Sequence, residues 1–103
     1  MSKLTIALDI MGGDHGPPVI LPAAVKAIQL HPDVHFTLCG DEDTIKAGIQ
    51  PLTNAERNRV TIVHCSQVVE MGEAPTSALR NKKDSSMRRV IELVESGEAN
   101  ACV

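Results

Sequence analysis

Short apolar runs alternate along the chain with longer segments in which apolar residues recur at helical spacing. The runs cover residues 4–10, 34–40, 60–65 and 99–103, and each predicts a β-strand. In the first run, apolar side chains occupy both odd and even positions, which is typical of a parallel strand that is covered on both faces. Strands that alternate with helices predict an open, mainly parallel, doubly wound α/β sheet with helices on both faces.

The first helical segment covers residues 19–30 and follows Pro17 and Pro18, which suit the start of a helix. Inside this segment, the ring of Pro22 would clash with the carbonyl four residues earlier in a regular helix. We therefore expect either a kink at Pro22 or a helix that begins there. The sequence His31-Pro32-Asp33 should end the helix.

Two further helices are predicted from their capping residues. Asp41 is a good N-cap for a helix that runs to about Ile49, with acidic residues in its first turn. Thr53 and Glu56 have the spacing of a capping box, which predicts a single helical turn before the third strand.

The longest irregular stretch covers residues 66–83, with one short turn expected at 75–77. A connection of this length is usually functional or flexible. Asp84 or Ser85 then caps a final helix that Gly97 closes. The predicted buried face of this helix consists of Met87, Val90, Ile91 and Val94.

Composition indicates a cytoplasmic protein. The 103 residues suit one domain, and 43% hydrophobic with 22% charged residues is ordinary for a soluble globular chain. There is no apolar run of membrane-spanning length and no secretion signal. Cys39, Cys65 and Cys102 form no C-x-x-C pair, so we expect reduced thiols that each act as a small buried hydrophobe. Phe36 is the single aromatic residue, which counts against a nucleic-acid partner.

The glycine-rich turn after the first strand is the first candidate site. In open α/β sheets, ligands bind at the carboxyl ends of the strands, and Gly12, Gly13 and Gly16 allow the backbone to approach a ligand closely. The turn matches neither a dinucleotide fingerprint nor a P-loop. Two alternatives stay open: the glycine amides bind an anion beside Asp14, or the turn only joins a strand to a helix and Asp14 caps it.

Basic residues form the second candidate site. Five of the ten fall between residues 80 and 89, on a chain of formal net charge −3: Arg80, Lys82, Lys83, Arg88 and Arg89. Lys82 and Lys83 lie close in sequence to the hydroxyls of Ser85 and Ser86 and to a predicted helix N-terminus, which makes this the strongest candidate anion-binding site in the chain. The alternative is a solvated basic surface. The four histidines lack ligand spacing, so we expect no metal and no cofactor.

Three segments carry a family resemblance: IALDIMGGDHGPP, VHCSQVVEMGEAPTSALRNKKDSSM and GEANACV. Together they resemble the N-terminal third of the bacterial phosphate acyltransferases, the fatty acid/phospholipid synthesis proteins. The resemblance implies that residues 1–103 are the N-terminal α/β portion of a larger single enzyme, with the sheet truncated after about four strands. It also implies a fold similar to that of the isocitrate and isopropylmalate dehydrogenases.

The activity that the resemblance implies is transfer of a long-chain acyl group from acyl carrier protein to inorganic phosphate, which gives acyl phosphate for phospholipid synthesis. Its partners would be acyl carrier protein, inorganic phosphate and a second copy in a homodimer, and peripheral association of the full-length protein with the membrane stays open. Gly12, Gly13, Asp14, Lys82, Lys83, Ser85 and Ser86 are the predicted phosphate-binding residues. No catalytic residue is assigned, because the family's Ser-Ala-Gly-Asn-Thr-Gly loop follows the fourth strand, and residues 1–103 alone should be inactive.

Two other interpretations remain. Half of a nucleotide-dependent oxidoreductase would fit the fold, and it predicts changes in cofactor fluorescence. A non-catalytic module that uses residues 80–89 to bind an anion or an acidic carrier protein would show binding without turnover.

Overall fold

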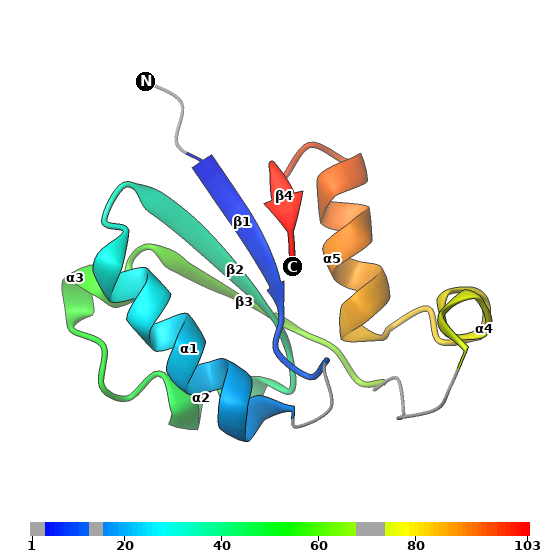
Figure 1. Cartoon of the computed structure of the whole chain (residues 1–103), viewed down its shortest axis with the longest axis horizontal. Coiled ribbons are helices and arrows are strands. Elements are labelled where there is room, and N and C mark those ends of the chain that lie inside the picture. Colours follow the sequence, from blue (N-terminus) through cyan, green and yellow to red (C-terminus); the bar gives the residue numbers. More distant parts are fainter. Residues whose placement is uncertain (1–3, 13–15, 68–73) are drawn as a thin grey trace.

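A computed structural model describes residues 4–12, 16–67 and 74–103, which fold around a four-stranded sheet (Figure 1). The strands are β1 (Leu4–Asp9), β2 (Val34–Gly40), β3 (Val60–His64) and β4 (Ala101–Cys102). Their order is β3-β2-β1-β4, and each neighbouring pair runs parallel. The predicted parallel α/β sheet is therefore confirmed.

Helices lie on both faces of this sheet (Figure 1). They are α1 (Pro17–Leu30), α2 (Glu42–Gly48), α3 (Asn54–Arg57), α4 (Pro75–Asn81) and α5 (Ser86–Glu95). Two neighbouring residues of β2 lie on opposite faces of the sheet. Leu38 packs in a hydrophobic cluster with residues of α1 and α2, while Cys39 packs in a second cluster with residues of α5. Because successive side chains of a strand point to opposite faces of the sheet, β2 contributes to two separate cores.

The larger core lies between the sheet and the pair α1 and α2. Ile28 of α1, Leu38 of β2 and Ile45 of α2 are all completely buried in it. The smaller core lies under α5 and includes Ala7, Cys39, Cys65, Val90 and Ala99.

Burial of the cysteines differs from the prediction at one position. Cys39 and Cys65 are buried as expected, but Cys102 is exposed. The two-residue strand β4 pairs with β1 on one side and lies at the edge of the described sheet, so its side chains lack neighbours beyond it. The strand predicted at residues 99–103 is shorter, covering Ala101–Cys102, and both of its residues are exposed.

The start of α1 also differs from one of the two expectations. The helix begins at Pro17, so the alternative start at Pro22 is wrong. Pro17 and Pro18 occupy positions where a helix leaves its N–H groups without acceptors, so their missing hydrogens cost nothing. The N-cap is Gly16, whose φ of 62° lies in the left-handed region that favours glycine.

The predicted caps of the other helices are found. The carboxylate of Asp41 accepts a hydrogen bond from the backbone N–H of Thr44 at 3.0 Å and caps α2. Thr53 and Glu56 form the expected capping box of α3. Of the two alternatives for α5, Ser85 is the N-cap. The short turn expected at residues 75–77 is the start of the seven-residue helix α4.

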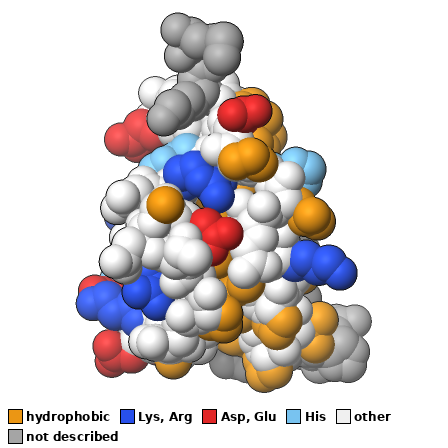
Figure 2. Space-filling model, turned by 90° about the vertical axis from the view of Figure 1, so that its left-hand side faces the viewer, with side chains coloured by type: hydrophobic (Ala, Val, Ile, Leu, Met, Phe, Trp, Pro, Cys, Tyr) orange, Lys and Arg blue, Asp and Glu red, His pale blue; other side chains and the backbone are white. Residues whose placement is uncertain are grey.

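Two surface features complete the description. No helix in the described part of the chain has the length and apolar character needed to cross a membrane. On the side that carries α3, acidic and basic side chains are interspersed among hydrophobic ones (Figure 2).

The first prediction concerns the larger core. Leu38→Ala should lower the free energy of unfolding by about 2–5 kcal/mol, because it removes a completely buried side chain and leaves a cavity. Leu30→Ala, at a position that is 64% exposed in α1, is the matched control and should change it by less than about 1 kcal/mol. Urea unfolding of both variants measures the difference, and equal losses would contradict this account of the core.

Candidate functional site

The carboxyl ends of β1, β2 and β3 lie at one edge of the sheet, together with residues 10–12 and the N-terminus of α5 (Figure 1). The Oγ of Ser86, the first residue of α5, donates a hydrogen bond to the Oδ1 of Asp9, the last residue of β1. This contact, between residues 77 apart in the chain, holds the start of α5 beside the end of β1, where the glycine turn begins.

Asp9 is the centre of this edge. Its Oδ1 also accepts a hydrogen bond from the backbone N–H of Met11 at 3.2 Å, which fixes the start of the glycine turn. A Cβ added at Gly12 would come within 2.6 Å of the Oδ2 of Asp9, so any larger residue there would displace the carboxylate. Gly12 and Ser86 therefore both lie against Asp9.

Sequence reasoning missed Asp9. The signal for it was present, because Asp9 is a lone carboxylate at the end of an otherwise apolar strand. A charged group at that position needs hydrogen-bond partners when the surrounding chain covers it. Its partner Ser86 could not be predicted, because it lies 77 residues away in the sequence and nothing local links the two residues.

The two serines of the predicted site are buried and hydrogen-bonded within the chain. Ser85 is completely buried, and its Oγ accepts a hydrogen bond from the backbone N–H of Arg88 at 3.2 Å. Ser86 is 2% exposed and donates to Asp9. Both hydroxyls are therefore used in hydrogen bonds within the chain at the N-terminal end of α5.

The remaining predicted site residues differ in exposure, and two of them lie outside the described residues. Lys82 is half-buried and Lys83 is exposed in the connection between α4 and α5. The backbone carbonyl of Lys82 accepts a hydrogen bond from the N–H of Ser85 at 3.2 Å, which holds Lys82 beside the N-cap of α5. Gly13 and Asp14 lie outside the described residues.

Asp84 ties the end of β3 to the start of α5. Its Oδ2 accepts hydrogen bonds from the backbone N–H of Ser66 at 2.9 Å and from the Ser66 Oγ at 2.5 Å. The side-chain Oε1 of Gln67 accepts from the N–H of Asp84 at 2.9 Å, while the N–H of Gln67 donates to the Asp84 carbonyl at 3.2 Å. The Ser66 hydrogen bonds, with a smaller contribution from the Arg89 guanidinium, lower the pKa of the Asp84 carboxyl from its ordinary value.

Arg88 and Arg89 of the basic segment both have polar partners within the chain, although Arg89 is exposed. Arg88 is half-buried and donates from Nη1 to the backbone carbonyl of Leu79 at 2.6 Å, so it holds α4 against α5. The Nε of Arg89 lies 4.0 Å from the Oδ1 of Asp84. Part of the basic charge is therefore matched within the chain.

Cys39, one of the two buried thiols behind this edge, is a poor nucleophile. A hydrogen bond with Cys65, followed by burial, raises the pKa of the Cys39 thiol far above its ordinary value. A thiol attacks as its thiolate, so Cys39 stays in its unreactive form. Within residues 4–12, 16–67 and 74–103, there is no group of three His, Cys, Asp or Glu side chains arranged to hold a metal ion.

An incoming anion would meet both signs of charge at this edge. The partial positive charge at the N-terminus of a helix favours an anion, and Lys82 and Lys83 add to it. The carboxylates of Asp9 and Asp84 are already there, and they would repel a second anion. A phosphate could bind only where the lysines and the glycine amides outweigh these carboxylates.

These features define an α/β protein with a candidate anion-binding site at the carboxyl edge of a parallel sheet. The chain belongs to the fatty acid synthesis protein family, whose model matches residues 4–103.

Similar proteins carry one name. The chain is 49% identical over 102 residues to the phosphate acyltransferase of Halorhodospira halophila, which covers 99% of this chain and 30% of that protein. It is 50% identical over 103 residues to the phosphate acyltransferase of Legionella pneumophila strain Paris, which covers 100% of this chain and 30% of that protein. The phosphate acyltransferase of Methylococcus capsulatus is 48% identical over 99 residues, or 96% of this chain and 29% of that protein. The chain thus spans about 30% of the length of these curated relatives.

The second prediction concerns the contact between Asp9 and Ser86. In a double-mutant cycle of Asp9→Ala and Ser86→Ala, the coupling in the free energy of unfolding should be about 1–3 kcal/mol, because the hydrogen bond joins a hydroxyl to a carboxylate. The matched cycle pairs Ser86→Ala with Asp41→Ala, which caps α2 through Thr44. That cycle should be additive within about 0.5 kcal/mol, and equal coupling in both cycles would refute a specific link.

The third prediction concerns acid unfolding. The folded state lowers the pKa of Asp84, so the unfolded chain binds more protons and stability falls as the pH is lowered. The contribution of Asp84 should be complete above about pH 5 and lost progressively below it.

Ser66→Ala removes the side-chain hydrogen bond to Asp84 and should flatten this acid limb of the stability curve. Ser96→Ala, which changes a serine at the other end of α5, is the control and should leave the slope of stability against pH in the acid range unchanged. Chemical unfolding between pH 2 and pH 7 measures both, and identical slopes for wild type and Ser66→Ala would contradict the assignment.

Proposed function

We propose that this chain is the N-terminal portion of a phosphate acyltransferase, a larger single enzyme that moves a long-chain acyl group from acyl carrier protein to inorganic phosphate. The product would be an acyl phosphate for phospholipid synthesis. The observation that carries the proposal is the contact of Ser86 with Asp9, which holds the N-terminus of α5, and the lysines just before it, at the carboxyl end of β1 where the glycine turn begins. The names of the relatives, at 48–50% identity, support the same activity.

The proposed chemistry needs little from the protein beyond positioning. An oxygen of hydrogenphosphate attacks the carbonyl carbon of the acyl thioester, the carbon–sulfur bond breaks, and the carrier leaves as a thiolate that takes up the proton lost by the phosphate. Such a step is accelerated by donors that hold the phosphate and by donors that stabilise the oxyanion. We assign the first role to the backbone N–H groups of Gly12, Gly13 and Asp14 and to the ammonium groups of Lys82 and Lys83, with Ser85 and Ser86 at the helix end.

Lys82 is central to this assignment. Its carbonyl is fixed to the N-cap of α5, so the lysine lies next to the helix end that attracts anions. Lys83 follows it on the exposed side of the same connection. The pair supplies the positive charge that a phosphate needs against Asp9 and Asp84.

The same proposal extends to the surroundings of the enzyme. We propose a fold of the isocitrate and isopropylmalate dehydrogenase type, a homodimer, and a cytoplasmic protein with acyl carrier protein and inorganic phosphate as partners. The exposed edge strand β4, with Cys102 and Val103 facing outward, is consistent with further chain beside it.

The direct test is an assay of the full-length enzyme for loss of acyl-acyl carrier protein with and without phosphate. Phosphate-dependent loss with formation of acyl phosphate is the expected result. Thioester hydrolysis at the same rate without phosphate would contradict the proposal. Residues 1–103 alone should give no activity above a blank without protein.

The fourth prediction concerns phosphate use by the full-length enzyme. Lys82→Ala should raise KM for phosphate by about ten-fold or more, because loss of a charge that holds the nucleophile costs roughly 1.4 kcal/mol or more. Arg89→Ala, which breaks a long ion pair with Asp84, should change it less.

The matched control is Lys26→Ala, at an exposed lysine of α1. Its kinetics should equal those of the wild type. If Lys82→Ala and Lys26→Ala both behave like the wild type, the basic segment is only a solvated surface and the phosphate site reduces to Gly12, Gly13 and Asp14.

A further inference from the structure

The two faces of the sheet are covered unequally. On one face, α1 and α2 pack over the strands, and Ile62 of β3 lies against the larger core. On the other face, α5 packs on β1, β2 and β4. Over β3 this second face remains open among the described residues, because Thr61 is exposed and Val63 is half-buried.

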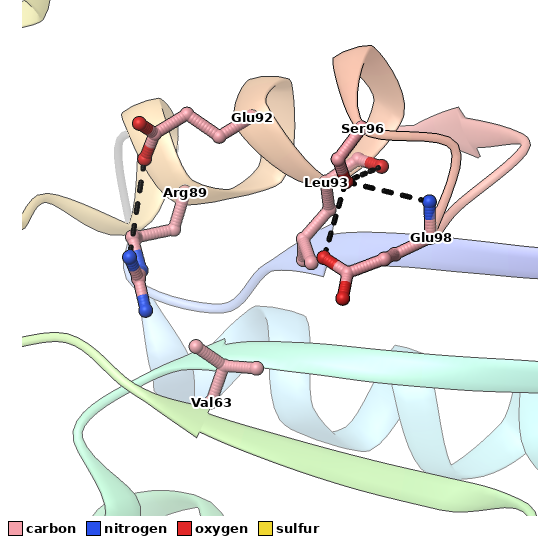
Figure 3. Close-up of a pocket in the computed structure, with 6 residues that line it drawn as sticks. All are labelled: Val63, Arg89, Glu92, Leu93, Ser96 and Glu98. Carbon is pink, nitrogen blue, oxygen red and sulfur yellow. Dashed lines mark hydrogen bonds and ion pairs between the residues drawn. The ribbon is translucent and has the colours of Figure 1, made fainter.

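A groove runs along this open half, between α5 and β3. It consists of two adjoining cavities of about 370 and 480 Å³, which share Val63, Leu93 and Glu98. Figure 3 shows the wall that α5 provides, with Val63 pointing up from β3 into the space beside it. The floor is formed by the side chains of Thr5, His35, Thr37 and Thr61.

The floor of this groove is polar but compact. The Nε2 of His35 and the Oγ1 of Thr61 are hydrogen-bonded at 2.7 Å, so the two side chains form a fixed surface. Thr37 is only 7% exposed. Small β-branched side chains of this kind pack well under another element of structure, and parallel sheets are normally covered on both faces.

The wall of the groove contains an oxygen that lacks a partner. Among the described residues, the Oε1 of Glu92 is shielded from solvent and accepts no hydrogen bond. The Nη1 of Arg89 lies 4.0 Å from this oxygen, which is too far for a hydrogen bond (Figure 3), and the Nε of Arg88 lies 3.7 Å from the other oxygen of the carboxylate. A shielded carboxylate oxygen is costly without a donor, so an additional N–H or O–H group beside it would be stabilising.

We propose that a helix from the remainder of the full-length polypeptide fills the α5–β3 groove and places a hydrogen-bond donor beside Glu92. The relatives supply ample chain for this, because the matched segment is about 30% of their length. A second copy is the weaker candidate, since two identical grooves facing each other across a two-fold axis are both concave and cannot fill one another. The inference rests on the proposal that this chain is the N-terminal portion of a larger protein, but its tests do not depend on the proposed activity.

The first test uses the unmodified full-length protein and the acylating reagent diethyl pyrocarbonate. His35 in the groove floor should react at least about ten-fold more slowly than the exposed His31, and the difference should vanish in denaturant. Rates within about two-fold of each other in the native protein would overturn the proposal.

The second test uses substitutions at Thr61 in the full-length protein. Thr61→Val removes the hydrogen bond to His35 but keeps the volume, whereas Thr61→Arg also projects a long side chain into the groove. Under a covering helix, Thr61→Arg should lower Tm by at least about 4 °C more than Thr61→Val does. Asn58→Arg, at an exposed residue just before β3, is the control and should leave Tm unchanged.

Two results would refute the proposal in these variants. Equal Tm values for Thr61→Arg and Thr61→Val would mean that the groove is open in the full-length protein. Dissociation of Thr61→Arg into monomers by light scattering, with His35 losing its protection on dilution of the wild type, would assign the groove to a second copy instead.

Discussion

The structure depends on the strand β1 and on the carboxylate at its end. β1 pairs with β2 along its whole length and with β4 at Ile6 and Ala7, so it joins the early and late parts of the chain. At its carboxyl end, Asp9 binds Ser86 through its side chain and donates its backbone N–H to the carbonyl of Val103 at 2.9 Å. Hydrogen bonds of this one residue thus position Met11, the start of α5 and Val103 just after β4.

This arrangement explains why the site segments are so far apart in sequence. A parallel sheet brings the carboxyl ends of successive strands to the same edge, and each crossover returns the chain there. Asp84 repeats the pattern on the other side of β2, since its hydrogen bonds to Ser66 tie the exit of β3 to the start of α5. Two carboxylates therefore fix the geometry of this edge, and Lys82 and Lys83, which we propose bind phosphate, lie in the connection just before α5.

The strands and the caps could be predicted because local chemistry decides them. Asp41 and the Thr53–Glu56 pair cap their helices through contacts three residues away, and the apolar run of β1 is visible in its own side chains. Contacts across the fold could not be predicted in this way. The role of Arg88 depends on the carbonyl of Leu79 in α4, and the exposure of Cys102 depends on its place at the sheet edge. The start of α1 was also decided by context, because Gly16 caps it ahead of Pro22.

The central claim is that an inorganic phosphate binds at the carboxyl edge, between the glycine turn and the connection before α5. The most direct measurement is a crystal structure of the full-length protein grown with phosphate and free of sulfate. The account predicts a phosphate oxygen within about 3.2 Å of the backbone N–H of Gly12 or the Nζ of Lys82. A phosphate bound elsewhere, with this edge of the sheet free of it, would contradict the account.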